Sequence, residues 1–189
     1  IQLYFDVRFS RSPQNPLDGS GDGEDGDGGD GDDGPTTLVV DADGTSTYDS
    51  VSLALLEAED GDRLEVRSGV YTESITVDEN VTIAFDDGAV LDGTGADRQS
   101  AIEIGSTAAP TVDGATVRGF GVGVDAENTS GDWTVRNLTV DGAETSGVDA
   151  TGSTGTWTLR EAVVRDVDNA SAVVALRTTG NWTVSGLDA

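Results

Sequence analysis

From about Thr37 onwards, short runs of alternating apolar and polar residues are broken by Gly, Asn and Asp. The dipeptide Trp-Thr marks a period, because Trp133, Trp157 and Trp182 are 24 and 25 residues apart. Earlier copies of the unit contain Thr82 and Thr111 and extend the series to five. Alternation is typical of β-strands and a fixed period is typical of solenoids. We therefore predict an all-β fold for residues 37–189, a right-handed parallel β-helix with about 24 residues per coil.

The start of this region predicts a cap for the solenoid. After a strand at 38–40 and a turn at 41–44, Asp49 or Ser50 can cap a short helix that runs to about Glu59. One face of this helix is apolar and consists of Val51, Ala54, Leu55 and Ala58. A stacked solenoid has an open end that must be covered, and we expect the helix to cover it.

Two segments precede the solenoid. Residues 1–10 alternate apolar and polar positions, which predicts an isolated strand that pairs with a preceding domain or a partner. Residues 11–36 form an acidic Gly/Asp linker, in which the run Asp18 to Gly34 holds eight Gly, eight acids and one Ser. Because this run has no apolar residue, nothing compensates the entropy lost on ordering it, and we predict disorder.

The charge of the chain restricts its partners. It carries 36 acidic residues against 10 bases, all of them Arg, for a net charge of −26. Such a surface repels nucleic acid and anionic lipid, and no apolar run reaches the roughly 18 residues of a membrane span. We therefore expect no nucleic-acid partner and no membrane insertion. Twenty-eight of the acids lie outside the linker run, and an acidic folded body without Lys resembles proteins of salt-loving archaea.

Three motifs carry a resemblance to a known family. They are Gly61-Asp62-Arg63-Leu64-Glu65-Val66, Gly69-Val70-Tyr71-Thr72-Glu73 and Asn80-Val81-Thr82-Ile83. The segment resembles the opening of pectin-lyase-like β-helix proteins, including pectin methylesterases and NosD-like surface proteins. The resemblance implies the fold, and its motifs are parts of the scaffold. The catalytic Asp pair with its Arg in the esterases, and the calcium-holding Asp cluster of the lyases, have no counterpart in this sequence.

The sequence leaves three functions open. The first is a non-catalytic, extracellular or cell-surface module for adhesion or for contact with polysaccharide or another envelope component. The second is the N-terminal part of a polysaccharide lyase or carbohydrate esterase whose catalytic coils follow Ala189. The third is a segment of a viral tail fibre or spike. The chain has no His and no Cys, so it lacks the usual general base and any thiolate metal site. Its oligomeric state is not fixed by the sequence.

Calcium is the one candidate ligand ion. Residues at equivalent positions of adjacent coils lie about 4.8 Å apart, so Asp125 and Asp149 are expected to be neighbours and to offer a calcium site or an acid/base pair. Asp41 and Asp43, before Gly44, suggest a second calcium loop. In the alternative interpretation all four are solvated turn residues.

Three further patterns make testable predictions. The three Trp residues form either a buried ladder, which we favour, or an exposed platform for sugar rings. Asp92, Arg118, Asp141 and Arg165 fall in one column with alternating charge, which predicts pairing between coils. Five Asn-x-Ser/Thr sequons suit a secreted N-glycosylated protein, and they begin at Asn80, Asn128, Asn137, Asn169 and Asn181.

Overall fold

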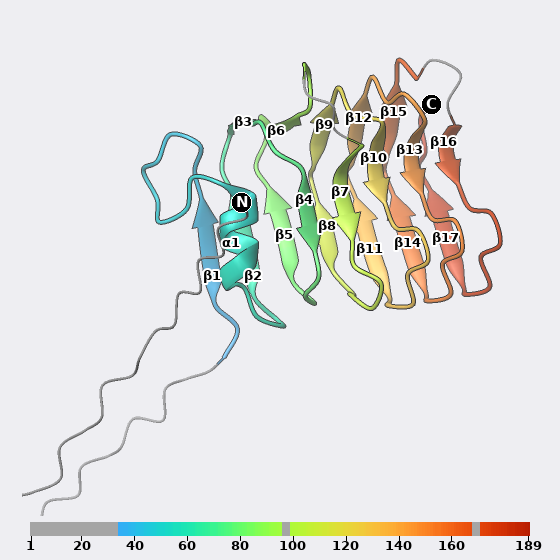
Figure 1. The fold of residues 1–189 in the computed structure, drawn as a ribbon, viewed down its shortest axis with the longest axis horizontal. Helices are drawn as coiled ribbons and strands as arrows, with labels where there is room; N and C mark the ends of the chain where they lie inside the picture. The colour runs from blue at the N-terminus through green and yellow to red at the C-terminus, as the bar shows by residue number, and fades with distance from the viewer. Residues whose placement is uncertain (1–33, 96–98, 168–170) are drawn as a thin grey trace, which may run out of the picture. The chain divides into compact units, whose positions relative to one another are not determined.

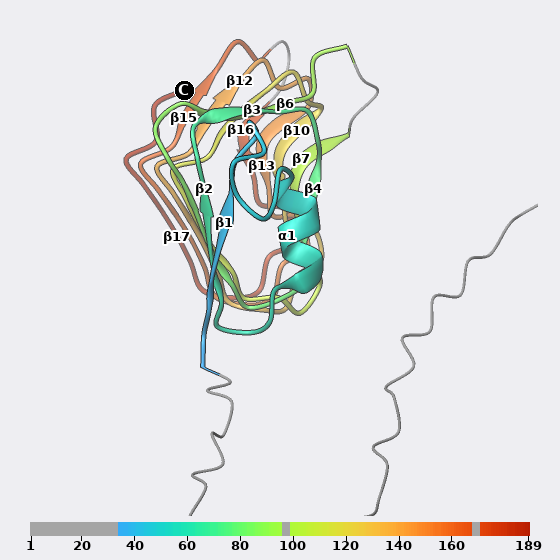
Figure 2. The ribbon, with the colours of Figure 1, turned by 90° about the vertical axis from the view of Figure 1, so that its left-hand side faces the viewer.

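A computed structural model describes residues 34–95, 99–167 and 171–189. The predicted strand 1–10 and all but the last three residues of the predicted linker lie outside these ranges. The described chain winds into three parallel sheets, A, B and C, and each complete coil contributes one strand to each sheet (Figure 1). Seen from the N-terminal end, the chain rises along sheet A, crosses along sheet B and descends along sheet C as it recedes, which is the right-handed sense (Figure 2).

The strands are short, and their order in each sheet follows the coils. Sheet A consists of β1 (Thr37–Val40), β2 (Arg63–Val66), β5 (Thr82–Phe85), β8 (Thr111–Asp113), β11 (Trp133–Arg136), β14 (Trp157–Arg160) and β17 (Trp182–Ser185). Sheet B consists of β3 (Gly69–Tyr71), β6 (Ala89–Asp92), β9 (Thr116–Arg118), β12 (Thr139–Asp141) and β15 (Val163–Arg165). Sheet C consists of β4 (Ile75–Val77), β7 (Ser100–Ile104), β10 (Val122–Asp125), β13 (Ser146–Asp149) and β16 (Ser171–Val174).

The predicted period is confirmed by the register of the strands. Trp133, Trp157 and Trp182 are directly paired in sheet A, as are the Thr residues that follow them. Apolar side chains such as Val135 and Leu159 point inwards and are fully buried, while the alternate positions face outwards. One continuous core of Val, Leu, Ile and Ala therefore runs through the coils, and it is the main source of stability.

The bends between sheets explain why Gly, Asn and Asp punctuate the sequence. Between β8 and β17, each bend places a residue in the left-handed region of φ, where side chains with a β-carbon are strained and Gly, Asn and Asp are best tolerated. These residues form three columns. The column that follows sheet A consists of Gly114, Asn137, Glu161 and Gly186. The column between sheets B and C consists of Gly119, Gly142 and Asp166, and the column between sheets C and A consists of Asn128, Gly152 and Arg177.

The predicted capping helix is present as α1 (Val51–Glu57), with Ser50 as its N-cap. It packs against β1, β2 and β4 at the N-terminal end of the solenoid (Figures 1 and 2). The helix ends at Glu57 rather than at the predicted Glu59. The reason is Asp62, whose carboxylate accepts hydrogen bonds from the Glu59 amide at 2.9 Å and from the Thr36 amide at 2.6 Å. These bonds hold the chain after Ala58 in an extended turn and lower the pKa of Asp62.

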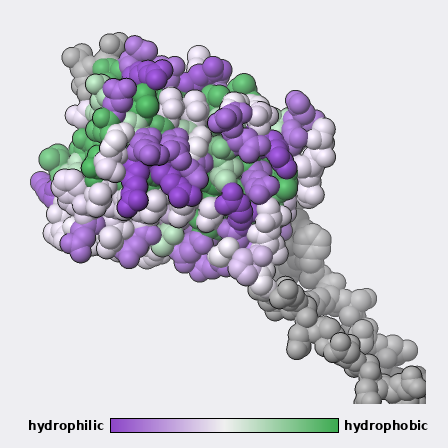
Figure 3. Space-filling view, turned by 180° about the vertical axis from the view of Figure 1, so that it is seen from behind, coloured by the Kyte–Doolittle hydropathy of each residue, from purple (hydrophilic) through white to green (hydrophobic). Residues whose placement is uncertain are grey.

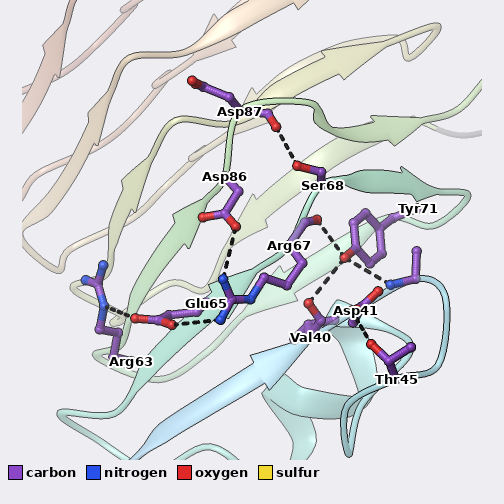
Figure 4. A network of polar contacts seen from close by, with 11 residues as sticks. Val40, Asp41, Thr45, Arg63, Glu65, Arg67, Ser68, Tyr71, Asp86 and Asp87 are labelled. Carbon is purple, nitrogen blue, oxygen red and sulfur yellow. Dashed lines mark hydrogen bonds and ion pairs between the residues drawn. The ribbon is translucent and has the colours of Figure 1, made fainter.

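The motifs behind the family resemblance serve this end of the scaffold. The buried Tyr71 hydroxyl donates to the Arg67 carbonyl at 2.9 Å and accepts from the Ala42 amide at 3.2 Å (Figure 4). The Glu73 carboxylate accepts from the Ser50 hydroxyl and the Val51 amide, each at 2.8 Å. Both side chains thus fasten the first turn and the helix to the second coil.

Charged side chains pair along the outer faces of sheets A and B. The predicted column of Asp92, Arg118, Asp141 and Arg165 is in register through four strands of sheet B. Within it, Arg118 binds Asp92 at 2.7 Å. Sheet A carries further pairs, such as Glu65 with Arg63 at 3.5 Å (Figure 4) and Arg136 with Asp113 at 2.9 Å. Seen from the sheet A side, hydrophilic side chains gather in patches on the surface (Figure 3).

Candidate functional site

Sheet C carries a column of carboxylates on its outer face. Asp125 and Asp149 are directly paired in β10 and β13, as predicted. The structure adds Glu103 of β7, which pairs with Asp125 on the other side. The core residues Ile102, Val124 and Val148 precede these acids in the three strands. Three successive coils therefore present a carboxylate at one position.

Asp125 and Asp149 are aligned by a motif that both contain, Gly-Val-Asp-Ala at 123–126 and 147–150, and this landmark misses Glu103. Glu103 stands between two Ile residues in a strand that begins Ser-Ala, so its strand lacks that landmark. Aligning Ile102-Glu103 with Val124-Asp125 and Val148-Asp149 would have found it, since in each case a buried residue precedes an acid.

Local hydrogen bonds hold these carboxylates in place. Asp125 accepts from the Ser100 hydroxyl of the preceding coil at 3.3 Å and from the Glu127 amide at 3.1 Å. Asp149 accepts from the Thr151 amide at 2.9 Å. Glu127 lies close enough for the negative charge of Asp149, with smaller effects of burial and of Asp125, to raise the pKa of Glu127. The carboxylates are therefore positioned by the fold and repel additional negative charge.

Beside this column lies a groove formed by two adjoining hollows of about 280 and 340 Å³, which we call the sheet C groove. Gln99, Ser100 and Asp125 belong to both hollows. The first hollow is completed by Ser74, Ile75, Thr76 and Glu103. The second is completed by Gly121, Val122, Glu144 and Thr145. The groove therefore spans several coils and offers hydroxyl, amide and carboxylate groups, which can form hydrogen bonds with a polyhydroxylated ligand.

The arginines whose positions are described lie away from sheet C. Arg63, Arg118, Arg136, Arg160 and Arg165 belong to strands of sheets A and B, Arg67 follows β2, and Arg177 lies in the turn after β16. Within the described part of the chain, the charged groups that line the groove are all acidic. These described carboxylates repel an anionic polymer.

The other predicted calcium residues lie apart from the groove. Asp41 and Asp43 are in the turn between β1 and α1. Asp41 accepts from the Thr45 hydroxyl at 2.5 Å and the Asp43 amide at 3.0 Å, and the Thr45 bond is the main cause of its lowered pKa. In the described ranges, no three His, Cys, Asp or Glu side chains gather so as to hold a metal ion. Calcium binding at Asp41, Asp43, Asp125 or Asp149 stays a prediction.

The Trp ladder is confirmed, and its first two members are buried. Trp133 and Trp157 are each 1% exposed, and their rings stack with centroids 4.9 Å apart. Trp182 stacks on Trp157 at 5.4 Å and is 51% exposed. The alternative sugar platform is therefore wrong for Trp133 and Trp157, whose faces are covered.

Four of the five sequons lie in the described ranges, and Asn169 lies outside them. Asn80, Asn128, Asn137 and Asn181 are all exposed. Asn137 is at a bend between sheets A and B, and the other three are between sheets C and A. All four are thus on the edges of the solenoid rather than on the faces of the sheets.

Comparison with known proteins found no relative of this chain. No protein family model, no curated protein and no solved structure matches the chain. Of the helices in the described ranges, none is long and apolar enough to cross a membrane. The function is therefore inferred from the fold and from the sheet C groove.

Proposed function

We propose that this chain is a non-catalytic, extracellular β-helix module that binds neutral polysaccharide of a cell envelope in the sheet C groove. The observation that carries the proposal is the groove itself, which extends over several coils and combines carboxylate, hydroxyl and amide groups. An extended ligand with a hydroxyl at each repeat suits a site whose own groups repeat with every coil. Carboxylates are the stronger acceptors for such hydroxyls.

The proposed ligand is neutral because of the charge around the groove. Glu103, Asp125 and Glu144 line it, and none of the described arginines lies on sheet C. A polyuronate, the polymer that the pectin-lyase-like resemblance suggests, would be repelled unless cations bridged it. We accordingly place the chain among surface β-helix proteins of that superfamily rather than among its pectin-cleaving enzymes.

The environment we propose is the exterior of a salt-loving archaeon. Support comes from the excess of acids over bases and from the absence of Lys. The exposed sequons on the edges of the solenoid are consistent with a secreted glycoprotein.

Affinity electrophoresis tests the binding proposal. The full chain is run in gels that contain neutral glucans, neutral mannans or polygalacturonate, at molar and at low salt. We expect a neutral polysaccharide to retard the chain and polygalacturonate at low salt to leave it unretarded. Asp125→Asn should weaken the retention by about tenfold, as expected for loss of hydrogen bonds to a charged group.

Asp87→Asn is the matched control, since it removes one exposed carboxylate in the turn between β5 and β6, outside the groove. Its retention should equal that of the wild type. Equal losses in both variants would mean that net charge, rather than the groove, controls migration. New reducing ends or unsaturated sugars after incubation would replace the proposal with an enzymatic one.

A further inference from the structure

The described sequons differ in what their side-chain amides do. N-glycosylation requires the Asn Nδ2 atom as the attacking group. In Asn80 this atom donates to Asp60 Oδ2 at 2.9 Å, while Asn80 Oδ1 accepts from the Ala109 amide at 2.7 Å. The Asn80 backbone amide also donates to Asp60 at 2.8 Å. Asn80 therefore joins three successive coils, and both the nitrogen and the oxygen of its side-chain amide are hydrogen-bonded.

Asn137 is engaged in a similar way. Its Nδ2 atom donates to Asp113 Oδ1 at 2.7 Å, and the other oxygen of Asp113 binds Arg136 at 2.9 Å. The Asn137 side chain thus belongs to a link between adjacent coils. Freeing its Nδ2 atom would break a hydrogen bond to a charged group.

Asn181 lies in the same column as Asn80, immediately before the aligned Trp residues. At the equivalent position of an earlier coil, Asp132 Oδ1 accepts from the Thr156 amide of the next coil at 2.6 Å. Asn181 lies in the last described coil, and its side chain makes no hydrogen bond in the described ranges, so within this column it is Asn80 whose amide is held.

Asn128 differs from Asn80 and Asn137 because its amide is free of such bonds. It is exposed, has a φ of 55° at the bend between β10 and β11, and its side chain has no hydrogen-bond partner in the ranges described. The next coil places Gly152 beside it, so close that a β-carbon there would lie 2.5 Å from Asn128 Oδ1. Because position 152 is Gly, no side chain from that position covers the Asn128 amide, and the residue is exposed to solvent.

We infer that Asn128 is an N-glycan acceptor of this chain and that Asn80 and Asn137 are structural residues that remain unmodified. In the reaction, Asn128 Nδ2 attacks the anomeric carbon of a polyprenyl-diphosphate-linked oligosaccharide. A carbon–nitrogen bond forms, the carbon–oxygen bond to the diphosphate breaks, and that oxygen leaves with the electron pair. The nitrogen gives up one proton to the transferase or to solvent. The inference rests on the proposed extracellular location, because the donor is used outside the cytoplasm.

Glycosylation of the purified, folded chain tests this inference apart from polysaccharide binding. The chain is incubated with a lipid-linked oligosaccharide and an oligosaccharyltransferase that requires only Asn-x-Ser/Thr, and is analysed by intact mass and glycopeptide mapping. We expect occupancy at Asn128 at least about tenfold above that at Asn80 or Asn137, because those amides must first break hydrogen bonds to carboxylates. The unfolded chain should accept glycan at all three.

Matched variants remove each sequon in turn. Asn128→Asp, which suits the left-handed backbone, and Ser130→Ala should both abolish the modification at Asn128, with circular dichroism confirming the fold. Thr82→Ala and Thr139→Ala remove the sequons at Asn80 and Asn137 and should leave the mass added by the glycan unchanged. Occupancy of Asn80 or Asn137 in the folded chain equal to that of Asn128, or an unmodified Asn128, would overturn the inference.

Discussion

The hydroxyl of Ser146 is buried in sheet C without a hydrogen-bond partner. The register explains why. The equivalent Ser100, two coils earlier, donates to Asp125 of its next coil at 3.3 Å. For Ser146 the corresponding residue of the next coil is Val174, which pairs with Asp149 and has no acceptor in its side chain. Ser146 thus keeps a polar group at a position where the repeat no longer supplies its partner.

Replacing this hydroxyl should stabilise the protein. A buried polar group without a partner costs about 1–3 kcal/mol, so Ser146→Ala should raise the free energy of unfolding by about 1 kcal/mol after the small loss of packing. Ser100→Ala, which removes a hydroxyl that does have a partner, is the matched control and should lower it. Chemical denaturation of both variants measures the difference. The same sign for both would show that the hydrogen-bond partner is not what distinguishes them.

At the residue scale, the periodicity of the sequence predicted which side chains are buried but not which hydrogen bonds they form. The burial of Trp133 and Trp157 followed from their place two residues before another inward side chain. The hydrogen bonds of the two Trp side chains could not be predicted from this alternation. Trp133 Nε1 donates to the Thr129 hydroxyl at 3.1 Å, whereas Trp157 Nε1 has no partner in the described ranges, although Ser153 stands at the position equivalent to Thr129. A Ser rotamer is set by its surroundings, and the repeat does not specify it.

At the scale of strands and helices, the sequence predicted the coil period and the capping helix. These features depend on repeated contacts, since each strand meets its own equivalent in the next coil. The groove was not predicted, because it depends on which side chains line the hollows and on how deep these are. The column of carboxylates on sheet C was predicted in part. Asp125 and Asp149 were identified, and Glu103 was missed because its strand departs from the repeat.

The charge column of sheet B gives a prediction at this scale. Arg118 is in register with Asp92 and Asp141, and its side chain holds the pKa of Asp92 below the ordinary range. Arg118→Ala should lower the melting temperature slightly at pH 7, and Arg118→Asp should lower it more, because three carboxylates then lie in a row.

The pH dependence of the melting temperature shows whether the carboxylate charges cause these differences. A lowered pKa means that Asp92 contributes stability above the ordinary Asp value of about 4, and that this contribution is lost as the pH falls through the folded pKa. In scanning calorimetry the two variants should therefore converge as the pH falls below about 4, because their carboxylates become protonated. Equal melting temperatures at pH 7 would remove the charge ladder as a contributor to stability.

At the scale of the whole molecule, the excess of acids is the dominant feature. The chain has 36 acidic residues against 10 basic ones, and the carboxylates of sheet C lie on a face without described arginines. Glu127 shows the consequence locally, because Asp149 and Asp125 raise its pKa and its charged form is disfavoured in the fold. Ion pairs on sheets A and B offset only part of this repulsion, since exposed pairs contribute little.

Salt should therefore stabilise the protein. The Debye length falls from about 30 Å at 0.01 M to about 3 Å at 1 M salt, which removes repulsion between surface carboxylates. We expect the melting temperature to rise steadily with NaCl or KCl into the molar range.

Because salts also strengthen apolar burial, Glu127→Gln provides the control. A raised pKa means that the Glu127 charge destabilises the fold at neutral pH, so the variant should melt higher than the wild type at low salt, and this gain should vanish at molar salt. A wild-type melting temperature that is flat or falls with salt would contradict adaptation to a saline environment. A gain for Glu127→Gln that is independent of salt would show that repulsion is not its cause.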